Sequence, residues 1–112
     1  MKVGHLDFSA YGPNYLLCQV GNVICALPLQ NIVETLRPQQ VIAVSGQRPA
    51  FVEGISIIRS KPTPIVNVGK LLAENDGRDP GRLVLLRLAE GQVALAVDKV
   101  HGVHELQNQQ LM

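Results

Sequence analysis

The chain has 112 residues, a formal net charge of +1, 46% hydrophobic residues and 17% charged residues. This length and apolar content predict one folded domain and exclude a disordered chain. The ten basic residues are scattered along the chain, which argues against nucleic-acid binding. No apolar run approaches the roughly 20 residues that span a bilayer, and the N-terminus lacks the apolar core of a signal peptide. We therefore expect a cytoplasmic protein with no membrane contact.

The first predicted element is a β-hairpin that follows a mobile arm, residues 1–12, which has room for one short strand. Tyr15–Val20 and Val23–Leu27 are rich in β-branched and aliphatic residues, and Gly21-Asn22 between them is typical of a two-residue turn. This register places Cys18 opposite Cys25. Because a cytoplasmic chain keeps its thiols reduced, we expect two apolar core thiols rather than a disulfide.

Residues 28–37 fit two structures. Apolar residues at 29, 32, 33 and 36 form a helical stripe, whereas the crowding of Ile, Val and Thr after Asn31 favours a strand. Pro38 ends this element, Gln40–Val44 is predicted as a short strand, and residues 45–49 form a loop.

Two apolar, β-branched strands follow, Ile55–Ile58 and Ile65–Val68. The six residues between them carry two prolines, which cannot donate to a ladder and therefore predict a fixed turn. Gly69–Glu74 has room for one or two helical turns, and residues 75–81 are the most turn-rich segment.

The last third of the chain predicts a second hairpin and a further extended segment, Asp98–Leu106. Arg82–Ala89 and Gln92–Val97 flank Glu90-Gly91, a register that places Leu86 opposite Leu95. Short strands at even spacing with tight turns indicate small β-barrels.

The stretch from Pro49 to Val68 resembles the signature of CheW-like domains, the coupling proteins of bacterial chemosensory arrays. Five residues match the family pattern without a gap: Pro49, Phe51, Gly54, Arg59 and Pro64. The chain departs from the pattern at three positions, where the family has Asn, Gly and Asp: Ile57, Ser60 and Asn67.

The resemblance covers about residues 13–106, including the segments that begin at Leu29 and Asp98. It implies an all-β fold of two small SH3-like barrels packed side by side, the first formed by both chain ends and the second by the middle. For residues 28–37 it implies one helical turn followed by a strand. The family's C-terminal strand and helix would be missing here. We expect the N-terminal arm or a second copy of the chain to cover the resulting strand edge.

The resemblance also implies a non-catalytic adaptor without a cofactor. Its partners would be the cytoplasmic signalling domain of a chemoreceptor (a methyl-accepting chemotaxis protein) and a CheA-type histidine kinase or another CheW-like protein. The incomplete first barrel favours an accessory role with weakened kinase coupling. The alternatives are full receptor–kinase coupling, a self-assembling structural module that forms homodimers or larger assemblies, and a small-ligand-binding barrel.

The sequence contains no recognisable catalytic or metal-binding constellation. His101 and His104 have the spacing of a helical metal pair, but Gly102 and Val103 favour a strand, on which residues three apart face opposite sides. The serines lack the context of a nucleophile elbow. We therefore expect no enzyme and no metal site.

Seven residues are candidates for partner binding. Glu34 and Arg59 are lone charges in apolar strands at positions that match the family, so we expect them to pair or to contact a partner rather than extend into solvent. A salt bridge between them would join adjacent strands of the first barrel and its junction with the second. The other five candidates are apolar residues of the predicted strands: Ile32, Leu36, Ile57, Val100 and Val103.

Overall fold

The computed structural model describes residues 14–74 and 79–105. Its elements in chain order are β1 (Asn14–Val20), β2 (Val23–Pro28), the 3-10 turn η2 (Leu29–Asn31), β3 (Ile32–Leu36), β4 (Val52–Ile58), β5 (Lys61–Asn67), α1 (Val68–Leu71), β6 (Arg82–Leu88), β7 (Gly91–Val97) and β8 (Lys99–Glu105). The all-β class is thus confirmed. The predicted N-terminal arm and the segment after Glu105 lie outside the described residues.

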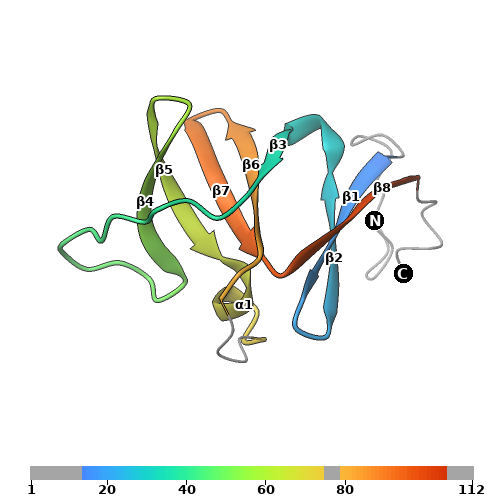
Figure 1. Ribbon diagram of the computed structural model, residues 1–112, viewed down its shortest axis with the longest axis horizontal. Helices are drawn as coiled ribbons and strands as arrows, with labels where there is room; N and C mark the ends of the chain where they lie inside the picture. Colours follow the sequence, from blue (N-terminus) through green and yellow to red (C-terminus); the bar gives the residue numbers. More distant parts are fainter. Residues whose placement is uncertain (1–13, 75–78, 106–112) are drawn as a thin grey trace, which may run out of the picture.

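The strands form two sheets that lie side by side (Figure 1). An antiparallel sheet of three strands, in the order β2-β1-β8, combines the beginning and the end of the described chain. A sheet of five strands, in the order β3-β6-β7-β5-β4, contains the middle, with β5 and β7 parallel. The predicted division into a unit from both ends and a unit from the middle is therefore confirmed.

The core consists of two apolar clusters, one between the two sheets and one within the five-stranded sheet. The first joins β1 to the five-stranded sheet and includes Cys18, Val84 and Val97, while the second lies on the other side of β6 and includes Leu83 and Leu85. Successive side chains of a strand point to opposite faces, so β6 contributes to both clusters and is apolar on both faces. This is why residues 83–86 show no alternation with polar residues.

The first half of the chain follows the sequence-based prediction closely. The β1–β2 hairpin turns at Gly21-Asn22, and its register places Val20 opposite Val23 and Cys18 opposite Cys25. One helical turn, η2, then precedes β3, as the family resemblance implied.

Two of the predicted turns were wrong. The β4–β5 connection has two residues, Arg59 and Ser60, and both have positive φ. Both prolines therefore belong to β5, which is possible because β5 pairs with β7 only from Ile65 onward and the missing N–H groups cost no ladder bond there. The β6–β7 turn consists of residues 89 and 90, which places Leu86 opposite Val93 rather than Leu95.

The predicted strand Gln40–Val44 is also wrong in extent. Residues 37–50 are exposed throughout, and only Ile42 forms a bridge, to Ile55 of β4. This segment crosses the five-stranded sheet and reaches β4 at its outer side (Figure 1).

Candidate functional site

An ion pair joins the two outermost strands of the five-stranded sheet. Arg59 directly follows β4, Glu34 lies in β3, and the Arg59 Nε donates a hydrogen bond to the Glu34 Oε2. Because β3 and β4 are opposite edges in the strand order, the sheet must curl until these edges approach each other. The predicted pairing is confirmed, but both residues belong to the unit from the middle of the chain, not to the junction with the first unit.

The turn that carries Arg59 has an unusual backbone. Arg59 has φ 54° and Ser60 φ 63°, values that favour glycine at both positions of a two-residue hairpin turn. The side chains remain accessible, at 56% for Arg59 and 29% for Glu34. An exposed pair of this kind stabilises a fold by about 1 kcal/mol or less. The strained turn therefore orients a charged surface more than it stabilises the protein.

The other five candidate residues do not gather around this ion pair. Ile32 and Val100 pack against the first apolar cluster, and Leu36 packs against the second. Ile57 and Val103 are more than half exposed, but they lie on β4 and β8, in different sheets. The structure thus joins Glu34 to Arg59 and distributes the other five candidates over two clusters and two sheets.

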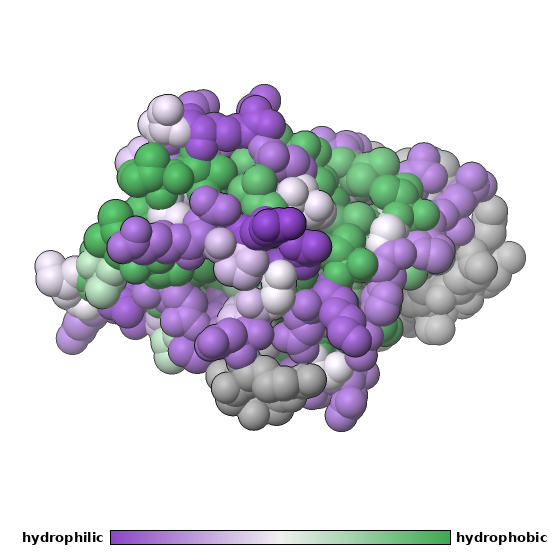
Figure 2. Space-filling view, viewed as in Figure 1, coloured by the Kyte–Doolittle hydropathy of each residue, from purple (hydrophilic) through white to green (hydrophobic). Residues whose placement is uncertain are grey.

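An apolar surface lies at the end of the molecule that contains β4, and sequence reasoning named only one of its residues, Ile57. Figure 2 shows apolar side chains at the left of the molecule, where Figure 1 places β4 and the segment that crosses it. The exposed apolar residues there are Val41, Ile42, Val44 and Ile57. The signal was present in the sequence, because residues 39–47 include no charged side chain.

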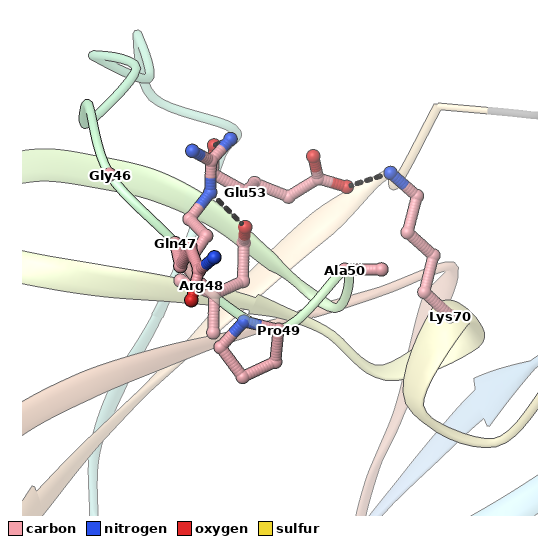
Figure 3. A pocket seen from close by; sticks show the side chains of 8 residues that line it. Gly46, Gln47, Arg48, Pro49, Ala50, Glu53 and Lys70 are labelled. Atoms are coloured by element: carbon pink, nitrogen blue, oxygen red, sulfur yellow. Dashed lines mark hydrogen bonds and ion pairs between the residues drawn. The ribbon is translucent and has the colours of Figure 1, made fainter.

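An open pocket of about 690 Å³ lies beside this surface, lined by residues 46–50, Glu53 and Lys70 (Figure 3). Its polar groups bind one another. Arg48 donates from Nη1 to the Val44 carbonyl at 2.7 Å and from Nε to the Val52 carbonyl at 2.8 Å. The Lys70 Nζ lies 3.0 Å from the Glu53 Oε1.

Glu53 supplies the carboxylate that lines this pocket. Burial raises its pKa, but hydrogen bonds from Asn67 and Lys70 and the charges of Lys70 and Arg48 outweigh burial, so the pKa lies below its ordinary value. The Asn67 Nδ2 lies 2.8 Å from the Glu53 Oε1, and the Asn67 Oδ1 accepts a hydrogen bond from the Lys70 backbone N–H at the start of α1. A ligand would have to displace these internal contacts, so the pocket does not favour a small-molecule function.

The two thiols are paired across β1 and β2 and are both free. Burial, with a smaller contribution from Cys25, raises the pKa of Cys18 to about 11, and burial also raises the pKa of Cys25. A thiol reacts as a nucleophile or binds a metal in its deprotonated form, which these environments disfavour. The structure thus agrees with the expected core thiols.

The described residues hold no group of three His, Cys, Asp or Glu side chains that could bind a metal ion. Both histidines of β8 are exposed, and the His101 Nε2 lies 2.9 Å from the Gln19 Oε1. Within the described ranges, no helix has the length and apolar character needed to cross a bilayer.

Comparison with known proteins identifies the family. Residues 14–112 match the family described as the CheW-like domain. The chain belongs to the CheW-like domain family. Its fold is similar to that of the scaffolding protein TtCheW from Thermoanaerobacter tengcongensis, with a TM-score of 0.78 and 18% sequence identity over 87% of this chain and 67% of that chain. No curated protein sequence matches the chain.

Membership in the CheW-like family confirms the resemblance found in residues 49–68. CheW-like domains are scaffold and coupling modules of chemotaxis signalling, so the chain is assigned to this class of adaptor. In this CheW-like chain, Ser60 replaces the glycine of the family pattern at a position where the backbone requires positive φ. The departure therefore adds strain next to Arg59.

Proposed function

We propose that this CheW-like chain is a non-catalytic adaptor that binds the cytoplasmic signalling domain of a chemoreceptor. The ion pair between Glu34 and Arg59 is the observation that supports this proposal. Arg59 in a strained turn and Glu34 in β3 form an accessible ion pair that contributes little to stability, which is typical of a surface oriented for a partner. Receptor signalling domains are helical, so docking would use a helix against this curled sheet. This function places the chain in the cytoplasm.

The decisive experiment measures the binding of a receptor signalling-domain fragment by titration calorimetry. Glu34→Arg and Arg59→Glu should each weaken binding by at least about tenfold, because each leaves two like charges side by side. The double reversal should restore affinity, since it rebuilds the pair with opposite polarity. Lys61→Glu is the matched control, because Lys61 is exposed and forms no ion pair among the described residues.

Absence of rescue in the double variant would show that the pair does not act as a unit. Absence of receptor binding by the wild-type protein would reject the proposed function itself. A parallel titration with the regulatory domain of a CheA-type kinase distinguishes an accessory with weakened kinase coupling from a full receptor–kinase coupling protein. Binding to both partners supports full coupling, and binding to the receptor alone supports an accessory role.

A further inference from the structure

The segment that crosses to β4 exposes an open strand edge. Ile42 donates to the Ile55 carbonyl at 2.7 Å and accepts from the Ile55 N–H at 2.9 Å, so both of its backbone groups face β4. In an antiparallel ladder the backbone groups of neighbouring residues face the other side. The N–H and C=O groups of Val41 and Ala43 therefore point away from the sheet. No hydrogen bond joins them to another part of the described chain.

The side chains around this edge are apolar and accessible. Val41, Ile42 and Val44 are 42%, 54% and 39% exposed, and Ile57 of the adjacent β4 is 55% exposed. The cross-strand partner of Ile42 is Ile55, whose side chain points to the same face of the sheet as that of Ile57. Ile42 and Ile57 thus form one apolar surface beside the free backbone groups.

The edge lacks the features that normally prevent strand pairing. Natural edge strands carry lysine, proline or inward charges, whereas residues 39–47 contain no charged residue and no proline. Pro38 and Pro49 lie outside this interval and limit it on both sides. An uncharged, β-prone edge of this length is suited to pairing with another strand.

We propose that this edge pairs in antiparallel fashion with the same edge of a second copy of the chain. Placing Ile42 opposite Ile42 of the second copy sets Val41 opposite Ala43 on both sides of the two-fold axis. The four free groups of each copy then form four backbone hydrogen bonds, and no group is left over. The axis also places the exposed apolar side chain of Ile42 against its counterpart, and this match of apolar with apolar surface favours a second copy as the occupant.

The charged residues near the two-fold axis are compatible with this antiparallel dimer. The charged residues flanking the interval in sequence are Arg37 and Arg48. The Arg48 guanidinium is bound to the carbonyls of its own chain, including that of Val44, and so is held within its own copy. Arg37 and Arg48 lie five and six residues from Ile42, so no charged residue of the segment lies at the axis itself.

The size of the contact predicts its strength. Three backbone positions and four apolar side chains per copy are far fewer than the roughly 20–30 residues per side of a standard interface. The dimer should therefore be weak in dilute solution and populated only where the local concentration is high. This interface lies on the five-stranded sheet. The sequence had instead suggested that a second copy adds a strand to the first unit, which contains the three-stranded sheet.

Sedimentation equilibrium at protein concentrations up to about 1 mM tests the proposal, since weak dimers populate in this range. The wild-type protein should self-associate. Ile42→Lys, which places two charges at the axis, and Ala43→Pro, which removes a free donor without breaking an internal bond, should each weaken dimerisation by at least about tenfold. Ile24→Lys is the control, because Ile24 is 53% exposed on β2 of the other sheet.

Cysteine crosslinking provides an independent geometric test. The axis brings the Cα atoms of residue 42 to about 4.5 Å, within the range of a disulfide. The Cα atoms of residue 44 would be about 13 Å apart, beyond that range. Under copper–phenanthroline oxidation, Ile42→Cys should therefore form a covalent dimer much faster than Val44→Cys. A wild-type protein that stays monomeric, or equal crosslinking rates, would overturn the proposal.

Discussion

Arg59 and Ser60 have left-handed backbone conformations that cost a non-glycine residue about 1–2 kcal/mol. We predict that Ser60→Gly raises the free energy of unfolding by about 0.5–1 kcal/mol, because glycine removes the steric cost but loses more entropy on folding. Urea denaturation measures this change. Ser45→Gly is the control, since Ser45 is exposed and has no positive φ. Equal destabilisation by both substitutions would contradict the role of turn strain.

Glu53 predicts a dependence of stability on pH. Its pKa is lowered in the folded state, so the unfolded chain takes up the proton first as the pH falls. The stability it contributes is present at neutral pH and is lost as the pH falls below about 4.3 and through the folded pKa. Because the side chain is about a third exposed, this contribution should not exceed about 1 kcal/mol.

Glu53→Gln should therefore lower the stability at pH 7 and have progressively less effect below pH about 4. Chemical denaturation across this range provides the measurement. Glu90→Gln serves as the control, because Glu90 is an exposed turn residue without an ion-pair partner in the described parts of the chain. A difference between wild type and Glu53→Gln that does not vary with pH would contradict the prediction.

At the scale of elements, the tip of the β1–β2 hairpin is hydrogen-bonded to Asp98, the residue that connects β7 of the five-stranded sheet to β8 of the three-stranded sheet. The Gly21 N–H donates to the Asp98 Oδ2 at 2.7 Å, and the Asp98 N–H donates to the Gln19 carbonyl at 2.9 Å. Gly21 has φ 56°, and a Cβ there would lie 2.8 Å from the Glu74 carbonyl. The tip can therefore approach the segment that follows α1 only with glycine at this position.

We predict that Asp98→Ala lowers the free energy of unfolding by about 1.5–3 kcal/mol, since it removes a charged acceptor from a partly buried N–H. Asp98→Asn keeps an acceptor oxygen and should cost clearly less. Thermal and urea unfolding of both variants test this difference. Equal losses would show that the carboxylate acts through its charge alone and not through the bond to Gly21.

At the scale of the whole molecule, β6 connects the two apolar clusters through adjacent residues, Val84 in the first and Leu85 in the second. Packing in one cluster therefore constrains the other. We predict a single cooperative unfolding transition, although the strands form two sheets. Leu16→Ala in the first cluster and Leu85→Ala in the second should each shift this same transition and cost about 2–5 kcal/mol.

Differential scanning calorimetry of these variants provides the measurement. Leu88→Ala, on the same strand as Leu85 but 45% exposed, should change stability by less than about 1 kcal/mol. Two resolved transitions, each moved by only one of the core variants, would show that the sheets unfold independently.

Local sequence patterns determined the elements that depend on neighbouring residues alone. The Gly21-Asn22 turn set the register of the first hairpin, because a two-residue loop leaves its strands one favoured alignment. The lone charges Glu34 and Arg59 were recognisable because charges are rare in apolar strands. The family signature in residues 49–68 supplied the division into two units, which composition and spacing could not.

The tertiary structure alone decided how these elements meet. Ile32 and Leu36 of β3 would share a face by strict alternation, but the register shift between Ile32 and Glu34 directs them to different clusters. The contact of Glu34 with Arg59 depends on a curled sheet in which β3 and β4, although consecutive in the chain, form opposite edges. Likewise, Ile42 bridges to β4 while Val41 and Ala43 stay open, because strand pairing depends on which neighbours the whole fold supplies.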